Sequence, residues 1–206
     1  MTYSVSDAND NAADSVTRTV SVVDTTKPVI TLLGNATETV EAKSAYTDAG
    51  ASASDTLDGS LTVTSVSTVD TDAVGIYTVT YSVSDANGNA AAEVTRTVSV
   101  VDTTKPVITL LGNATEIVEA KSIYKDAGVS ASDTLDGSLT VTTLNTVNTD
   151  AVGSYTVTYS VSDANGNAAV NVVRTVSVVD TTNPVITLLG SANEIVEAKG
   201  LSLIHI

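Results

Sequence analysis

The chain contains no cysteine, tryptophan or phenylalanine, and His205 is its one histidine among 206 residues. Without cysteine it forms no disulfide and lacks the Cys and His sets that bind zinc. Basic residues are also few, since 9 Lys and Arg stand against 24 Asp and Glu, a formal net charge of −15. Such acidity does not suit nucleic-acid phosphates or anionic membranes, and no apolar run reaches the roughly 18 residues of a membrane span. We expect no nucleic-acid partner and no membrane insertion.

Groups that carry out catalysis are equally scarce. With no thiol and one imidazole near the C-terminus, the chain offers neither a cysteine nucleophile nor a well-placed histidine base. Carboxylate pairs such as Asp55 and Asp58 occur, but a glycosidase also needs aromatic side chains to hold its sugar. The 7 Tyr mostly fall at positions expected to be buried. We predict that the chain is not an enzyme.

A repeat of 78 residues organises the chain. The phrase DTTKPVITLLG begins at Asp24 and again at Asp102, and the variant DTTNPVITLLG begins at Asp180. Residues 23–100 and 101–178 align without a gap and differ at 12 positions. A repeat of this length determines the architecture, because each copy has to form the same structural unit. The predicted divisions are a C-terminal remnant of a preceding repeat at 1–23, complete repeats at 24–101 and 102–179, the start of a further repeat at 180–199, and a non-repeat tail at 200–206.

Neither end of the chain fits the repeat. Met1 aligns with Val79, in the middle of a predicted strand, and the repeat fails after Lys199, where the chain reads GLSLIHI. We therefore expect the chain to be a piece of a longer array with an artefactual tail. His205 lies in that tail and is left out of functional reasoning.

The repeat has the pattern of strands throughout. Residues 76–83 (IYTVTYSV) alternate large apolar with Thr and Ser side chains, the period of a half-buried antiparallel strand. Residues 91–101 continue this pattern after the turn DANGN, in which Asn-Gly favours a type I′ turn and Asp85 an Asx bond. PVITLL, ETVEA and SLTVTSV indicate further strands, and nothing shows a sustained helical period. The predicted fold class is all-β, as tandem immunoglobulin-like antiparallel β-sandwiches.

The sequence also predicts where two individual side chains lie. Tyr77 follows Gly75 at the start of the penultimate strand, where such sandwiches keep a tyrosine whose hydroxyl bonds to upstream backbone. Arg96 interrupts an apolar phase; it could pair with an acid of a loop, or lie at the rim with its stem over the core edge. We favour the rim.

The motifs P.ITLLG, Y.DAG.SASDTLDGSLTV, VGxYTVTYSVSDANGNA and RTVSVVDTT.P recur in both complete repeats. Together they resemble the immunoglobulin-like repeats of bacterial surface proteins, which occur in large secreted adhesins and as accessory domains of pesticidal crystal proteins, with hyalin repeats as relatives. The resemblance covers each repeat from end to end. It implies a sandwich, a location outside the cell or on its surface, and a spacer or adhesion role.

Calcium is the candidate cofactor, because hard cations bind several oxygen ligands. DANGN begins like a calcium loop, yet the twelfth position from Asp85, where an EF-hand needs a bidentate Glu, is Arg96, which excludes an EF-hand. A plain hairpin turn with solvated acids is the alternative. If the strands around DANGN end the sandwich, this turn, the linker before the repeat and the loop SDTLDGS share one end. The candidate calcium ligands are Asp24, Asp55, Asp58, Asp85, Asn87, Asp102, Asp133, Asp136, Asp163 and Asn165.

The first functional interpretation is a non-catalytic spacer or adhesion module, a rod of repeats within a bacterial surface adhesin, stiffened by calcium at the domain junctions. The second is an accessory module of a secreted enzyme or toxin that binds polysaccharide. In either case the neighbouring repeats of the same chain are the expected partners, and a host-surface or polysaccharide ligand would bind through other domains.

Overall fold

The structure, a computed structural model, describes residues 1–195; the predicted tail at 200–206 and His205 lie outside the described residues. The chain divides into two compact units. The first takes in Met1–Pro106 together with Ser132–Leu139 and Ser162–Ala168, and the second takes in Val107–Ala131, Thr140–Val161 and the chain from Ala169 on. The loops 132–139 and 162–168 of the second repeat therefore group with the residues before Val107.

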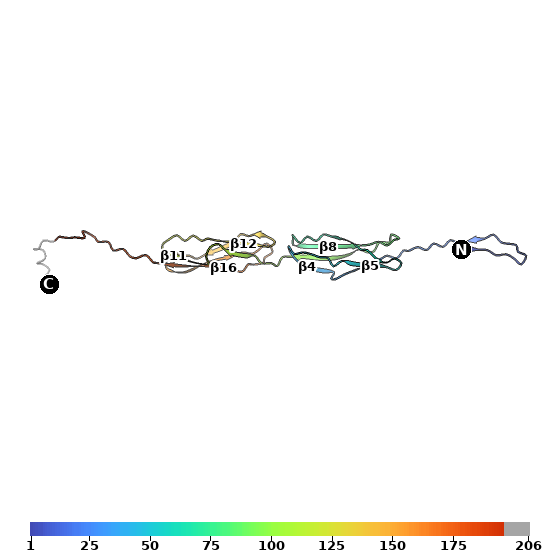
Figure 1. Cartoon of the computed structure of the whole chain (residues 1–206), viewed down its shortest axis with the longest axis horizontal. Coiled ribbons are helices and arrows are strands. Elements are labelled where there is room, and N and C mark those ends of the chain that lie inside the picture. The colour runs from blue at the N-terminus through green and yellow to red at the C-terminus, as the bar shows by residue number, and fades with distance from the viewer. Residues whose placement is uncertain (196–206) are drawn as a thin grey trace. The chain divides into compact units, whose positions relative to one another are not determined.

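The first complete repeat folds into two sheets (Figure 1). One sheet has the order β3-β5-β6 and the other the order β4-β9-β8-β7. The strands are β3 (Val29–Leu32), β4 (Thr37–Glu41), β5 (Ala51–Asp55), β6 (Gly59–Leu61), β7 (Thr64–Ser67), β8 (Gly75–Ser82) and β9 (Val94–Val101). Two sheets of this kind in each repeat confirm the predicted sandwich.

The second repeat has the same two sheets, in the orders β10-β12-β13 and β11-β16-β15-β14. Its strands are β10 (Val107–Leu110), β11 (Thr115–Glu119), β12 (Val129–Asp133), β13 (Gly137–Ser138), β14 (Thr142–Asn145), β15 (Gly153–Ser160) and β16 (Val172–Val179). Before the first repeat, β1 (Thr2–Tyr3) pairs with β2 (Val16–Thr17). Residues 180–195 contain no strand.

The first strand region of each repeat contributes to both sheets. β3 pairs antiparallel with β5, and a few residues later β4 pairs parallel with β9, with Glu38 opposite Val98. The sandwich is therefore antiparallel except for this pair and its counterpart, β11 with β16. The parallel pair closes the core along β9 and holds Glu41 beside the end of the repeat.

The core lies between the two sheets. In the first repeat its buried members are Ile30, Ala53, Val79, Tyr81 and Val98. Val79, Tyr81 and Val98 come from β8 and β9, whose alternating positions were predicted to face inward, and the other sheet contributes Ile30 from β3 and the small Ala53 from β5. The small side chains explain a missed strand: β5 has the sequence ASASD, which lacks the β-branched and aromatic residues typical of strands. The predicted strand SLTVTSV is divided between β6 and β7.

The tyrosine predicted to bond to upstream backbone does so. The Tyr77 hydroxyl donates to the carbonyl of Ala73 at 2.9 Å, and Tyr155 makes the same bond to Ala151 at 2.9 Å. Each bond fixes the loop before the long strand β8 or β15 and supports the immunoglobulin-like fold.

Candidate functional site

The DANGN segment forms a tight turn held by its own side chains. Asp85 Oδ1 accepts hydrogen bonds from the backbone of Asn87 at 3.0 Å and Asn89 at 2.7 Å, and Gly88 N donates to the Asp85 carbonyl at 3.2 Å. Gly88 has a φ of 89° and Asn87 has no positive φ, so this is not the predicted type I′ turn, which needs positive φ at both central residues. The Asx bond of Asp85 was predicted correctly.

Three segments of the first repeat meet beside this turn. Asp58 Oδ2 accepts a hydrogen bond from Ala86 N at 2.9 Å, which ties the DTLDG loop to the turn. Asn89 Nδ2 donates to the carbonyl of Asp24 at 3.1 Å, which ties the linker to the same turn. As a result, carboxylate oxygens of Asp24, Asp58 and Asp85 lie within 4.8 Å of one another. We name these three residues and Asp55 the first acidic cluster.

The second repeat builds the same arrangement on Asp102. Asn167 Nδ2 donates to the Asp102 carbonyl at 3.1 Å, and Asp136 Oδ2 accepts from Ala164 N at 2.8 Å. Here the three carboxylates with oxygens within 4.8 Å of one another are those of Asp102, Asp133 and Asp136. With Asp163 they form the second acidic cluster. All of these residues belong to the first compact unit.

Most carboxylates of the two clusters are buried. Asp55 and Asp85 are 8% and 7% exposed in the first cluster. Asp102, Asp133 and Asp163 are 9%, 9% and 8% exposed in the second. In the part of the chain that the structure describes, none of them forms an ion pair with Lys or Arg. Buried charges are ordinarily paired or bound to a metal, so buried carboxylates without a cationic partner are unusual.

Asp55 and Asp133 each leave one oxygen without a partner. Asp55 Oδ1 accepts from the backbone of Leu57 at 2.7 Å and Asp58 at 3.3 Å, and Asp133 Oδ1 makes the equivalent bonds. The other oxygen, Oδ2, is buried in both residues and has no hydrogen-bond partner among residues 1–195. The Oδ1 atoms hold the DTLDG loops in shape, and the Oδ2 atoms take no part in holding them.

The turn acid favours its ionised form. Burial raises the pKa of Asp85, but hydrogen bonds from the Asn89 side chain and from the backbone of Asn89, Asn87 and Gly88 outweigh it and lower the pKa overall. The pKa of Asp163 is lowered in the same way, by the Asn167 side chain and the equivalent backbone groups. Each cluster therefore contains at least one carboxylate that resists protonation.

The two asparagines predicted as calcium ligands, Asn87 and Asn165, already hydrogen-bond to an acid of their cluster. Asn87 Nδ2 donates to Asp24 Oδ2 at 3.4 Å, and Asn165 Nδ2 donates to Asp102 Oδ2 at 2.9 Å. Both amides thus present nitrogen to the neighbouring carboxylate and orient it. Asp70 and Asp72, at the opposite end of the strands, join no cluster, and Asp72 pairs with Lys43 at 2.9 Å.

A glutamate that sequence reasoning missed holds the linker after each repeat. Glu41 accepts hydrogen bonds from the backbone of Thr103 at 2.8 Å and Thr104 at 3.1 Å, and from both threonine hydroxyls at 2.8 Å. Glu119 makes the same bonds to Thr181 and Thr182. The recurrence of VEAK together with DTT was the available signal.

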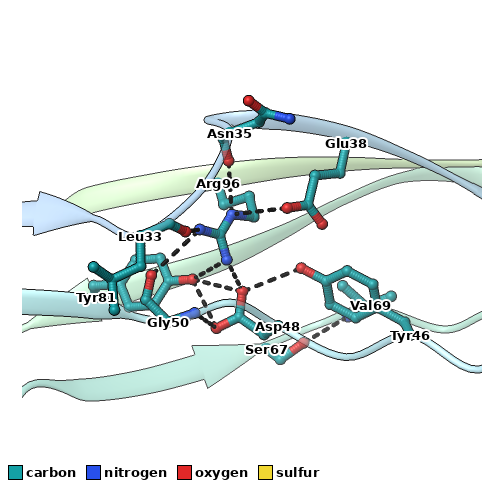
Figure 2. Close-up of polar contacts among 10 residues, drawn as sticks. All are labelled: Leu33, Asn35, Glu38, Tyr46, Asp48, Gly50, Ser67, Val69, Tyr81 and Arg96. Carbon is teal, nitrogen blue, oxygen red and sulfur yellow. Dashed lines mark hydrogen bonds and ion pairs between the residues drawn. The ribbon is translucent and has the colours of Figure 1, made fainter.

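Arg96 lies inside the sandwich, so the favoured rim position was wrong. Its side chain is 0% exposed. Nε donates to the Asn35 carbonyl at 2.8 Å, Nη1 to Asp48 and the Tyr81 hydroxyl, and Nη2 to the carbonyls of Leu33 and Gly50 (Figure 2). All five N–H donors of the guanidinium are used, which is why full burial is tolerated. This network is structural, and Arg174 makes the equivalent bonds to Asn113, Asp126, Leu111 and Gly128 in the second repeat.

The family comparison agrees with this architecture. The model for the bacterial surface protein, Ig-like domain matches residues 30–100 and again residues 108–178. The chain belongs to this family. Each match falls inside one of the two sandwiches and covers its long strand pair, β8–β9 or β15–β16, except for the last residue of the second strand. No curated protein matches the chain.

Two solved structures show weak similarity. One contains the M60 catalytic domain with the CBM51-1 and CBM51-2 domains of ZmpB from Clostridium perfringens, at 14% identity and a TM-score of 0.40 over 91% of this chain. The chain spans 34% of that structure's length. The other is the lipoprotein BT2262 from Bacteroides thetaiotaomicron, at 16% identity and a TM-score of 0.33, covering 71% of this chain and 99% of that one.

Proposed function

We propose that the chain is a non-catalytic spacer and adhesion segment of a bacterial surface protein, displayed outside the cell. The observation that carries the proposal is the repetition itself. Each repeat closes its own core with the same strands, and each linker is tied by hydrogen bonds to a glutamate of the repeat before it. An array of such units adds length with every copy, and that is the task of a spacer.

The chemistry of the surface supports the same function. The strongly negative charge keeps neighbouring molecules apart. Within the described residues no helix is long and apolar enough to cross a membrane. Among residues 1–195 the buried acids hold turns and linkers, the buried arginines belong to the Arg96 and Arg174 networks, and no histidine is present to act as a base beside them.

Polysaccharide binding by these repeats themselves is less well supported. Sugar-binding surfaces commonly use exposed aromatic rings, as apolar faces with a polar tip. In the two repeats Tyr81 and Tyr159 are buried in the core, and the other tyrosines are only partly exposed. Neither sandwich presents an aromatic platform.

The spacer proposal is tested by the size of longer arrays. Chains with two, four and six copies of the repeat should increase in maximum dimension by a constant amount in small-angle X-ray scattering. Each added repeat should contribute roughly 35–45 Å, and each step of two repeats roughly 70–90 Å, from eight-residue strands at about 3.4 Å per residue plus the loops at each end. Increments that shrink with copy number would contradict the proposal.

Location and ligand are tested separately. Antibodies against the chain should label intact cells of the bacterium that encodes it, and labelling only after permeabilisation would exclude surface display. A glycan array probed with the two-repeat chain should remain blank. Saturable binding of a polysaccharide would favour the accessory-module function instead.

A further inference from the structure

We propose that each acidic cluster is a calcium site that fastens the linker before a repeat to two loops of that repeat. The ligands are carboxylates of Asp24, Asp55, Asp58 and Asp85 in the first repeat, and of Asp102, Asp133, Asp136 and Asp163 in the second. The proposal does not depend on the spacer function, because a spacer without metal would remain a spacer.

The unpartnered oxygens of Asp55 and Asp133 are the deciding observation. An acidic cluster alone is common on protein surfaces, but these two residues are 8% and 9% exposed and each buries an oxygen that bonds to nothing. A buried acceptor without a partner is costly, and one belonging to a charged group costs more. The same atom is left free in both repeats. Asp133 is itself one of the three carboxylates whose oxygens lie within 4.8 Å of one another.

The ligand set fits calcium better than other metals. Every candidate ligand atom is an oxygen, the chain has no Cys, and no His lies among residues 1–195, which disfavours zinc and copper. The carboxylates come from three separate segments: the linker, the DTLDG loop and the DANGN turn. Ligands drawn from three separate loops suit the adaptable coordination of calcium at 2.3–2.6 Å, whereas magnesium needs a near-ideal octahedron and keeps its waters.

The site has a built frame before any ion binds. Asp85 Oδ1 and Asp55 Oδ1 are occupied by backbone N–H groups of their own turns, and Asn87 and Asn89 anchor Asp24. These bonds fix the loop backbones, and carboxylate oxygens of Asp24, Asp58 and Asp85 lie within 4.8 Å of one another, although Asn89 Nδ2 also donates to Asp85 Oδ2 at 2.7 Å. A cation bound there removes the repulsion between them and joins the linker to both loops.

Calcium titration of the whole chain tests the proposal. After chelator treatment, isothermal titration with calcium chloride should give about two ions per chain, with a Kd on the order of 10⁻⁴ M, as in other extracellular calcium modules. The melting temperature should rise by several degrees at millimolar calcium, because the ion binds only the folded state. Absence of binding overturns the proposal, and so does an equal rise with magnesium, since that would reflect charge screening.

The variant Asp55→Asn isolates the free oxygen. Asparagine keeps the Oδ1 acceptor for Leu57 and Asp58 but replaces Oδ2 with an amide nitrogen, which cannot bind a cation. We expect the stoichiometry to fall by half, because the second cluster is unchanged. An Asp55→Asn chain that binds calcium like the parent overturns the assignment.

A matched control is present in the sequence itself. Asp70 also accepts a backbone bond within its own turn, from Asp72 N at 2.9 Å, and the second repeat has Asn148 at this position with the same bond to Asp150 at 2.9 Å. Asp70→Asn therefore removes the same single charge, at a turn where the second repeat already has asparagine. It should leave calcium binding unchanged, and a loss of binding would show that net charge, not the site, is responsible.

A measurement on the unmodified chain covers the case in which Asp55→Asn does not fold. Amide chemical shifts during calcium titration should change at the linker, the DTLDG loop and the DANGN turn of each repeat, and remain constant around Asp70 and Asp72. Shifts spread evenly over the acidic surface would overturn the proposal.

Discussion

Arg96 is completely buried and its Nη1 donates to the carboxylate of Asp48, a residue 48 positions earlier in the chain. The Tyr81 hydroxyl donates to the same carboxylate, at 2.7 Å, and accepts from Arg96 at 2.9 Å. The pKa of Arg96 is raised even though burial lowers it, because Tyr46, Asp48 and Tyr81 favour the charged form. One guanidinium thus joins β9, β8 and the loop before β5.

Removal of Arg96 should strongly destabilise the first repeat. Arg96→Met leaves Asp48 and three backbone carbonyls without their donor, and breaking a buried ion pair in this way costs about 3–5 kcal/mol. Arg96→Lys should recover less than half of this, because an ammonium has three donors and no planar fork. Urea unfolding measures both.

The exposed pair Lys43–Asp72 provides the control for this prediction. Lys43→Ala removes an ion pair between solvent-exposed side chains and should cost at most about 1 kcal/mol. If Arg96→Met were no more damaging than Lys43→Ala, the structural role assigned to Arg96 would be wrong.

Loss of the tyrosine hydroxyl at the start of β8 should have a smaller, local effect. Tyr77→Phe removes only the bond to the Ala73 carbonyl and should lower the free energy of unfolding by about 1 kcal/mol. Tyr155→Phe removes the identical bond in the second repeat and should cost the same. Unchanged stability in both variants would mean that water replaces the bond at no cost.

The contrast between Tyr77 and Arg96 shows what the sequence can reveal. Tyr77 bonds four residues upstream, so its role follows from local position in a known strand pattern. Apart from the Tyr81 hydroxyl, the acceptors of Arg96 lie 46 to 63 residues away, and the periodicity of one strand contains no information about them. A charged residue in an apolar phase was therefore assigned to the rim, where it is more often found.

Strand prediction failed for a related reason. β8 and β9 are rich in Val, Thr and Tyr and were predicted nearly to the residue, whereas β5 is built from Ala and Ser. Its place in the sheet depends on pairing with β3 and β6 and on the fit of Ala53 into the core. Those are tertiary effects, and they override weak local preference. The closeness of the acids in each cluster could be predicted from topology alone, because a hairpin turn and the chain entering the domain lie at the same end of the sandwich.

Glu41 should control the protection of the linker that follows the first repeat. Among the residues that the structure describes, Thr103 N bonds only to Glu41, at 2.8 Å, whereas Thr104 N also bonds to Asp102 Oδ1 at 3.1 Å. In Glu41→Ala we expect amide hydrogen exchange to accelerate strongly at Thr103 and less at Thr104. Glu119→Ala serves as the control and should leave both amides unchanged; equal acceleration at Thr103 in the two variants would refute the assignment.

Protonation of Glu119 should release the linker that follows the second repeat. Hydrogen bonds from the Thr181 side chain, the Thr181 backbone and the Thr182 side chain lower the pKa of Glu119 from 4.5 to about 2. A lowered folded-state pKa means that these bonds contribute fully above about pH 4.5 and are lost as the pH falls through about 2. The amide shift of Thr181, followed by NMR, should therefore titrate near pH 2. Thr181→Val removes the hydroxyl that acts most strongly and should raise this midpoint towards 4.5; a midpoint already near 4.5 in the parent chain would show that the carboxylate is not held by the two threonines.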